Sequence, residues 1–229
     1  MTGNEAVAYG AYEAGVRYAS AYPGTPSTEI LENVALYDDI KAEWAANEKV
    51  ALEAAIGASI AGARSLSSMK HVGLNVASDA FMTVAYTGVN GGLVVITADE
   101  PGQHSSQNEQ DNRHFAAFGK VPMLEPSNSQ ESKDMIGTAL QISEDYDTPV
   151  LFRMTTRVCH SKSIVECGER QNHPIKEYNK DKAKYVIVPA YATKMRVKVE
   201  DRLEKLTDYS NKTDLNFIGG FGFKSGRNI

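Results

Sequence analysis

The stretch GGLVVITADE, residues 91–100, decides the fold of this chain. It is apolar, rich in β-branched side chains and preceded by glycines, a composition typical of a buried strand. Weaker runs of the same kind predict strands at 16–24, 40–45, 65–70, 121–127 and 149–158. A sheet built from such strands must be covered by other elements to be buried, and the segments between the runs have to supply that cover.

Helical patterns fill those segments, at residues 3–15, 25–37, 45–64, 75–88, 108–118 and 129–146. In the last of these, apolar side chains recur at roughly helical spacing. In the second, Thr25 is expected to cap the helix and Pro26 to take its first position. Alternation of helices with apolar strands predicts an α/β fold: a three-layer, doubly wound, mostly parallel sheet with helices on both faces.

The character of the sequence changes after Gly168. A polar stretch is followed by a short apolar run and a modest helical pattern, and the chain ends in glycine-rich sequence that looks like a frayed end; these segments are 169–185, 186–192, 197–209 and 217–229. They are too short for a second core. We therefore expect one domain at 1–168, with 169–229 forming a linker and the partial start of a next domain.

Composition excludes several function classes. The 229 residues carry a net charge of −5 and contain no run of Lys or Arg, so a nucleic-acid-binding face is not expected. No apolar run reaches the ~18 residues of a membrane helix, and the first residues do not resemble a signal peptide. The two cysteines, Cys159 and Cys167, match no zinc or cluster spacing. We expect reduced thiols in a cytoplasmic protein.

Function is expected beyond the carboxyl ends of the strands, where open α/β sheets bind ligands. These ends predict loops at 22–27, 47–48, 70–75, 99–111 and 156–161. In the first loop, a turn at Pro23 and Gly24 precedes a helix start, where free N–H groups favour an anion. Thr25 and Ser27 add hydroxyl donors, although plain helix capping explains them equally well.

Glu48 stands at the start of a helix made mostly of small side chains. Trp44, Ala45, Ala46, Val50 and Ala51 surround it in sequence, and Lys49 points about 100° away on a helix. A carboxylate in apolar company resists ionisation unless it is paired. The alternative is a surface glutamate favoured by the helix dipole.

Two further polar segments lie at the same edge. KHVGLN places Lys70, His71 and Asn75 at a junction between a strand and a helix. The long polar loop at 98–114 follows the best strand, and such loops are usually functional or mobile. Its acidic and histidine side chains show no recognisable ligand spacing, so we predict no metal site from Asp99, Glu100, His104, Glu109, Asp111 and His114.

Five segments together resemble a known family. They are YPGTPS, NEKVALEAAIGASIAGAR, MKHVGLNVASD, TADEPGQHSSQNEQD and LFRMTTRVCHS. In this order they resemble the large subunit of indolepyruvate:ferredoxin oxidoreductases, which belong to the 2-oxoacid:ferredoxin oxidoreductases that use thiamine diphosphate. The resemblance covers most of 3–170 and continues more loosely to about residue 215.

The resemblance implies the pyrimidine-binding domain of such an enzyme. In the family, a glutamate at the start of the small-residue helix bonds N1′ of the aminopyrimidine, and this position is Glu48. The implied cofactor-binding residues are Glu48, Pro23, Gly24, His71, Gly73 and Asn75. The implied substrate-binding residues are Thr25, Pro26, Ser27, His104, Gln107 and Asn108. The implied reaction is oxidative decarboxylation of indolepyruvate or another aryl 2-oxo acid to an acyl-CoA, with ferredoxin as acceptor.

The chain departs from the family in what it lacks. No diphosphate and magnesium motif is present, and two cysteines cannot hold a four-cysteine iron–sulfur cluster. We expect an incomplete subunit or fragment, inactive alone. Its partners are then a second copy, a chain carrying the diphosphate-binding domain, a smaller oxidoreductase subunit and ferredoxin. A non-catalytic scaffold and an anion-binding α/β domain stay open as alternatives.

Overall fold

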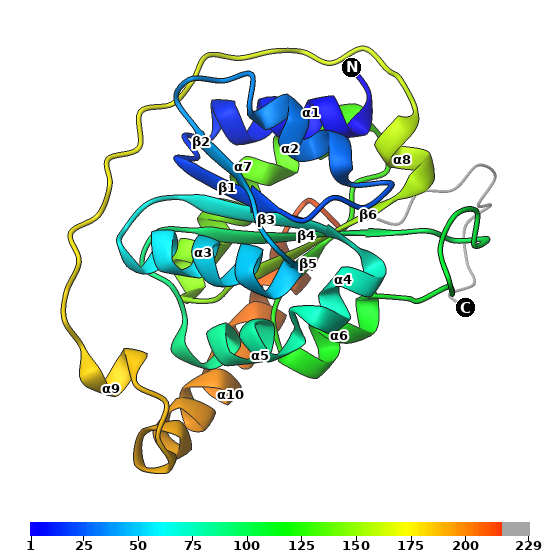
Figure 1. Ribbon diagram of the computed structural model, residues 1–229. Helices are drawn as coiled ribbons and strands as arrows, with labels where there is room; N and C mark the ends of the chain where they lie inside the picture. Colours follow the sequence, from blue (N-terminus) through cyan, green and yellow to red (C-terminus); the bar gives the residue numbers. More distant parts are fainter. Residues whose placement is uncertain (217–229) are drawn as a thin grey trace, which may run out of the picture.

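All strands of the central sheet run parallel, in the order β2-β1-β3-β4-β6-β5 (Figure 1). The computed structural model describes residues 1–216, so the predicted glycine-rich tail at 217–229 lies outside the described residues. The strands are β1 Tyr18–Ala21, β2 Lys41–Trp44, β3 Ser65–Lys70, β4 Leu93–Asp99, β5 Met123–Leu124 and β6 Val150–Thr155. The chain order reverses between β1 and β3, which confirms a doubly wound α/β fold.

Helices cover both faces of this sheet (Figure 1). One layer contains α1 Gly3–Glu13, α2 Thr28–Val34 and α7 Ser129–Tyr146. The other contains α3 Glu48–Ile60, α4 His71–Val76, α5 Ser78–Thr87 and α6 Arg113–Gly119. Three helices follow β6: α8 Thr156–His160, α9 Lys182–Tyr185 and α10 Pro189–Lys212.

Strand β4 shows why the sheet needs both layers. Every residue of β4 is buried, and successive side chains alternate between the faces. Val94 and Ile96 belong to the core under α1, α2 and α7, whereas Leu93 and Val95 belong to the core under α3 to α6. Burying such side chains contributes about 1.5–3 kcal/mol each.

The small-residue helix α3 packs directly on the sheet. Ser20 of β1 donates its hydroxyl to Ala51 O at 2.6 Å, and Ser65 of β3 donates to Ala55 O at 2.8 Å. A larger side chain at Ala51 or Ala55 would separate the helix from these strands. The small residues therefore serve packing within the chain on this face of α3.

The predicted start of the second helix was wrong. Helix α2 begins at Thr28 with Ser27 at the N-cap position, and Thr25 and Pro26 lie in the preceding turn, joined by a cis peptide bond. The nearby hydroxyls close the turn instead of capping the helix: Ser27 Oγ donates to Gly24 O, and Thr28 Oγ1 accepts from Gly24 N, both at 2.9 Å.

Other boundaries also differ from the predictions. The predicted helix at 75–88 begins earlier, because the fully buried His71 continues from β3 directly into a helix. It is also divided at Ala77 into α4 and α5. The predicted strand at 121–127 shortens to β5 at the edge of the sheet, and the predicted helix at 108–118 becomes α6. The C-terminal helix predicted at 197–209 is longer, since Pro189 takes its first position.

The segment after residue 168 crosses the edge of the sheet where the strands begin. Arg170 donates to Val16 O at 2.9 Å, and Lys176 N donates to Gly62 O at 3.0 Å. Helix α10 then packs against α5, burying Met195 and Val199. Residues 169–212 thus lie against the sheet and its helices, and the division at 168 stays a prediction.

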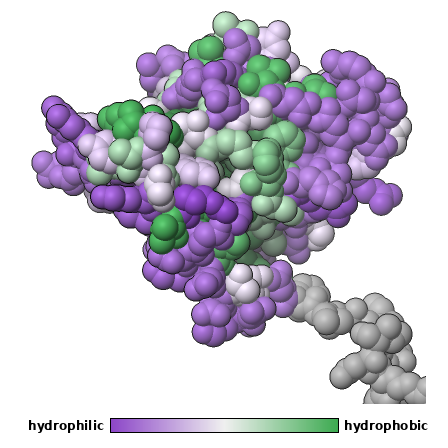
Figure 2. Space-filling model, turned by 90° about the horizontal axis from the view of Figure 1, so that it is seen from below, coloured by the Kyte–Doolittle hydropathy of each residue, from purple (hydrophilic) through white to green (hydrophobic). Residues whose placement is uncertain are grey.

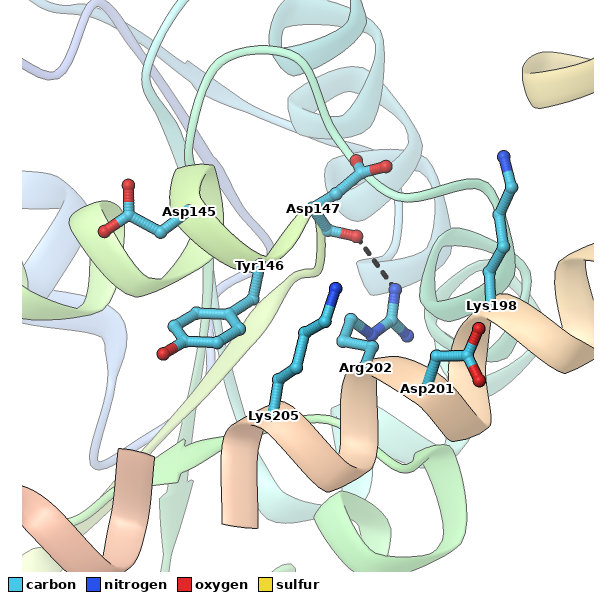
Figure 3. A pocket seen from close by; sticks show the side chains of 7 residues that line it. All are labelled: Asp145, Tyr146, Asp147, Lys198, Asp201, Arg202 and Lys205. Carbon is cyan, nitrogen blue, oxygen red and sulfur yellow. Dashed lines mark hydrogen bonds between the residues drawn. The ribbon is translucent and has the colours of Figure 1, made fainter. Parts of the chain in front are cut away.

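Arg202 anchors α10 to this edge. Its guanidinium donates to Asp147 O at 2.8 Å (Figure 3). It also donates to Ala85 O at 2.6 Å. Figure 2, which views the molecule from below the α5 and α10 side of Figure 1, shows a mainly hydrophilic face with a few small hydrophobic patches. Within residues 1–216, no helix combines the length and the apolar composition needed to cross a bilayer.

Candidate functional site

The candidate site lies at the carboxyl edge of the sheet, around the point where the strand order reverses. The loop after β1, the loop after β2 and the end of β3 meet there because β1 pairs with both β2 and β3. Parallel α/β sheets bind ligands in this crevice. The segments that the sequence singled out for function follow these strands, so the topology brings them to one edge.

Glu48 opens α3 at this edge and is 9 % exposed. Asn47 caps the helix, accepting from Val50 N at 3.0 Å, so the Glu48 carboxylate is not used as a cap. Lys49 points elsewhere and pairs with Asp79 at 2.8 Å, as its helical position predicts. Within residues 1–216, no donor is hydrogen-bonded to the Glu48 carboxylate.

Gly73 of α4 provides the space for this carboxylate. A Cβ atom added to Gly73 would lie 2.7 Å from both Cγ and Oε1 of Glu48. Two residues earlier, His71 is fully buried, and its Nε2 lies 2.9 Å from Asn108 O. His71 Nδ1 is buried without a hydrogen-bond partner among the described residues. Helix α4 therefore joins Glu48 to the 99–112 loop.

The YPGTPS turn lies on the β1 side of the crevice. Gly24 contacts the aliphatic part of Lys70, since a Cβ atom at Gly24 would lie 2.8 Å from Lys70 Cδ. Pro26 O accepts from Asn4 Nδ2 at 2.8 Å. Ser27 is buried with its hydroxyl committed to Gly24 O, whereas Thr25 and Pro23 are exposed.

A buried polar network holds the base of the long loop after β4. Asp99 Oδ2 accepts from Arg153 Nε at 2.7 Å and from Asn112 N at 3.0 Å. The Asn112 amide donates to Thr97 Oγ1 at 2.6 Å and to His71 O at 3.1 Å. Arg153 also pairs with Glu125. This network links β4, β6, α4 and the loop at one point.

Burial and hydrogen bonding shift the pKa values of Asp99 and Glu100 in opposite directions. Burial raises the pKa of Asp99, although the Asn112 N–H and the Arg153 guanidinium oppose that shift. Burial acts to raise the pKa of Glu100 as well, but hydrogen bonds from Ser105 and the charge of Lys70 bring it below its usual value. Glu100 is therefore held as an anion within the loop.

The other predicted site residues are distributed along the same edge. Asn75, His104, Gln107 and Asn108 are exposed, and Asn108 meets His71 through its main-chain oxygen. Within residues 1–216, the structure shows no group of three or more His, Cys, Asp or Glu side chains arranged to hold a metal ion. Cys159 is buried, Cys167 is exposed, and both thiols are free.

Sequence reasoning missed Arg153 and Asn112. Arg153 interrupts an apolar strand, and a charged side chain inside a buried strand requires a partner. That signal pointed to an acid on the neighbouring strand, and Asp99 occupies that place. Asn112 carried no comparable signal, because its role depends on contacts with β4 and α4.

A separate hollow lies at the opposite edge of the sheet. Figure 3 shows it between the end of α7 and α10, lined by charged side chains that include Asp147, Lys198 and Arg202. Asp147 precedes β6, so this hollow lies where the strands begin. It is thus separated by the sheet from Glu48 and is not the candidate site.

Chemically, the site at the carboxyl edge offers one little-exposed carboxylate, which lies against Gly73. Such a group can form a hydrogen bond with a ring nitrogen placed against it. A carboxylate within hydrogen-bond reach of a ligand nitrogen has the geometry that general acid–base catalysis requires.

Comparisons with known proteins show the family to which this chain is similar. Residues 9–212 match the family described as pyruvate flavodoxin/ferredoxin oxidoreductase, thiamine diP-bdg. The chain is 50% identical over 222 residues to the indolepyruvate oxidoreductase subunit IorA of Methanothermobacter marburgensis, covering 95% of this chain and 36% of that protein. It is 42% identical over 229 residues to the corresponding subunit of Archaeoglobus fulgidus, covering 95% and 36%.

Two more distant relatives place the fold. The 2-oxoglutarate synthase subunit KorA of Methanothermobacter thermautotrophicus is 30% identical over 184 residues, covering 74% of this chain and 48% of that protein. A solved structure of 2-oxoglutarate:ferredoxin oxidoreductase from Magnetococcus marinus, with 2-oxoglutarate, coenzyme A and succinyl-CoA bound, has a TM-score of 0.74 at 20% identity. The structural match covers 91% of this chain and 45% of that chain, and it shows that the two share a fold. The chain thus spans about a third of the length of its indolepyruvate oxidoreductase relatives.

Proposed function

This chain belongs to the pyruvate flavodoxin/ferredoxin oxidoreductase family through its thiamine diphosphate-binding domain, and we propose that it forms the pyrimidine-binding half of that cofactor site. The enzyme that contains it oxidatively decarboxylates indolepyruvate, or another aryl 2-oxo acid, to an acyl-CoA with ferredoxin as acceptor. The substrate assignment is supported by the names of the relatives at 42–50% identity.

The carrying observation is the environment of Glu48. Glu48 as a whole is 9 % exposed, and its carboxylate has no hydrogen-bond partner within residues 1–216. Gly73, which has no side chain, leaves the space in which the Glu48 side chain lies. A little-exposed carboxylate without a protein partner gains a hydrogen bond when the nitrogen of a ligand is placed against it. The residues present therefore fit a polar heterocycle seated against Glu48.

When bound, thiamine diphosphate supplies an electron sink for decarboxylation. Glu48 would hold a proton at the pyrimidine N1′ atom. His71 and Gly73 keep α4 against Glu48, and Pro23, Gly24 and Asn75 line the same edge of the sheet. The chain's own contribution is to orient the ring, exclude water and hold that proton.

The 2-oxo acid is proposed to contact the YPGTPS turn and the loop after β4. Thr25 presents an exposed hydroxyl, and Pro26 and Ser27 shape the turn around it. His104, Gln107 and Asn108 contribute from the exposed part of the loop. Because the Ser27 hydroxyl already donates to Gly24 O, Thr25 is the hydroxyl of this turn that we assign to the substrate.

The remaining machinery is proposed to lie on other polypeptide segments. The magnesium and diphosphate half-site and the iron–sulfur clusters belong to the part of the enzyme that this chain does not span. A smaller subunit, ferredoxin and a second copy of the chain complete the assembly. A cytoplasmic location also stays a prediction from the sequence.

The decisive test is Glu48→Gln in the assembled enzyme, which keeps the shape and removes the acid. We expect turnover of indolepyruvate to fall by roughly 10²-fold or more, in the range of lost general acid–base catalysis. Glu53→Gln, an exposed position on the same helix, is the control and should leave turnover unchanged. Full turnover in the Glu48 variant would instead favour a scaffold role for this fold.

A further inference from the structure

Lys70 ends β3 at the crevice where the strand order reverses. Its aliphatic part is held against the YPGTPS turn, since a Cβ atom on Gly24 would lie 2.8 Å from Lys70 Cδ and 3.0 Å from Cγ. A side chain at position 24 would displace this lysine. The turn and the lysine are therefore built to fit each other, and Lys70 is half-buried between them.

The charge pattern separates Lys70 from its neighbours. Lys49 pairs with Asp79, Arg113 pairs with Asp111, and Arg153 pairs with Asp99. Within residues 1–216, Lys70 makes neither an ion pair nor a side-chain hydrogen bond. Arg157 is also unpaired there, but it is exposed. It lies on α8, which follows β6, and β6 is separated from β3 by β4 in the sheet. Lys70 is thus the half-buried, unpaired cation at the switch point.

Acidic groups at the same edge make a cation necessary for an anionic ligand. Glu48 stands on the neighbouring helix, and Glu100 follows β4 and is 1 % exposed. Burial acts to raise the pKa of Glu100, while the positive charge of Lys70 is one of the influences that lower it. Lys70 is therefore near enough to act on Glu100 through space, yet it is not consumed in a bond to it.

We infer that Lys70 receives the carboxylate of the 2-oxo acid, an assignment that rests on the proposed function. A lysine ammonium has three donors and a compact charge, and its bond to a carboxylate strengthens when water is excluded. The diphosphate of the cofactor offers the same anionic chemistry. Its half-site is proposed on another part of the enzyme, and the measurements below distinguish the two anions.

The first experiment is Lys70→Met in the assembled enzyme. The KM for indolepyruvate should rise about 10- to 100-fold, the range of one lost charged hydrogen bond, with a much smaller change in kcat. Lys70→Arg should restore part of that loss. Lys49→Met, which removes a charge at the same edge, is the control and should leave the KM unchanged. The Kd for thiamine diphosphate and the KM for coenzyme A should also stay unchanged.

A second measurement does not depend on turnover. Calorimetry on the holoenzyme compares the unreactive acid indole-3-propanoate with its neutral amide. The wild type should bind the acid more tightly, and Lys70→Met should lose that preference. Equal binding of acid and amide by the wild type overturns the inference, as does an unchanged KM in Lys70→Met. Weakened binding of thiamine diphosphate with an unchanged KM assigns Lys70 to the diphosphate and overturns it too.

The two proposals fail separately. If Glu48→Gln keeps full turnover, the proposed function fails whatever Lys70 does. If Glu48→Gln is inactive while Lys70→Met keeps the wild-type KM and the preference for the acid, only the assignment of Lys70 falls.

Discussion

Gly73 and Glu48 lie so close that a Cβ atom on Gly73 would stand 2.7 Å from Oε1 of Glu48. The atoms in the way are the far end of a flexible side chain, so the side chain can move while the backbone stays in place. Space at Gly73 therefore decides where the proposed acid points, without deciding whether the chain folds.

Gly73→Ala should consequently lower activity more than stability. We expect turnover to fall about 10²-fold, the cost of a misplacement near 1 Å, with the melting temperature almost unchanged. Turnover and thermal denaturation of the same preparation check this. Gly137→Ala on α7 is the control, because a Cβ atom there meets only Ala14 Cβ, at an ordinary 3.8 Å. A fully active Gly73→Ala enzyme would show that the position of the carboxylate does not matter.

Arg153→Met should destabilise the chain strongly. It leaves Asp99 buried without its 2.7 Å ion-pair partner, and breaking a buried pair costs about 3–5 kcal/mol. Chemical denaturation measures the free energy of unfolding. Adding Asp99→Asn to the first substitution should recover much of the loss, since the buried charge is then gone. No recovery in the double variant would show that packing, and not charge, explains the cost.

Glu144 should make the free energy of unfolding depend on pH at acidic pH. Burial acts to raise its pKa, but the Arg64 guanidinium and Gly92 N–H lower it to about 2. Because this value lies below the usual 4.5, the pair stabilises the fold above pH 4.5 and loses that effect as pH falls toward 2. The loss amounts to roughly 3 kcal/mol. Unfolding curves across this pH range, compared with Glu144→Gln, should differ most at neutral pH.

Arg202→Met should loosen α10 from the rest of the chain. Arg202 is 9 % exposed, and its substitution leaves Asp147 O and Ala85 O without their hydrogen-bond donor. We expect the free energy of unfolding to fall by about 2 kcal/mol. Hydrogen exchange should increase first in 189–212. Arg196→Met, on the exposed side of α10, should change stability by less than about 0.5 kcal/mol. Equal effects of the two substitutions would contradict the anchoring role.

Gly57→Lys tests the proposed second copy of the chain. The outer side of α3 leaves Ala54, Gly57, Ala58 and Ala61 partly or fully exposed. A side chain at Gly57 meets no atom of its own chain within 4 Å, so folding should be unaffected. If this face joins two copies, a lysine should weaken the dimer, measured by sedimentation. An unchanged dimer dissociation constant would place the interface elsewhere.

Much of the architecture was predictable because it depends on local patterns. The run 91–100 and the helical spacing of 129–146 correspond closely to β4 and α7, and residues 65–70 form β3 as predicted. The family was also accessible, since its motifs are short and contiguous. Helix starts were less accessible: Thr25 was a reasonable cap by residue type, yet the Ser27 and Thr28 hydroxyls are used to close the turn at Gly24.

The sequence by itself determined an α/β chain with alternating layers, a polar loop after its best strand and an acid at the start of a thin helix. Those properties follow from periodicity and residue type. Only the tertiary structure decided that Gly73 accommodates Glu48, that Arg153 neutralises Asp99 and that Lys70 lies against Gly24, with no ion-pair partner in the described part of the chain. Each of these relationships joins segments distant along the chain, and strand order, which brings such segments together, is not encoded in any one of them.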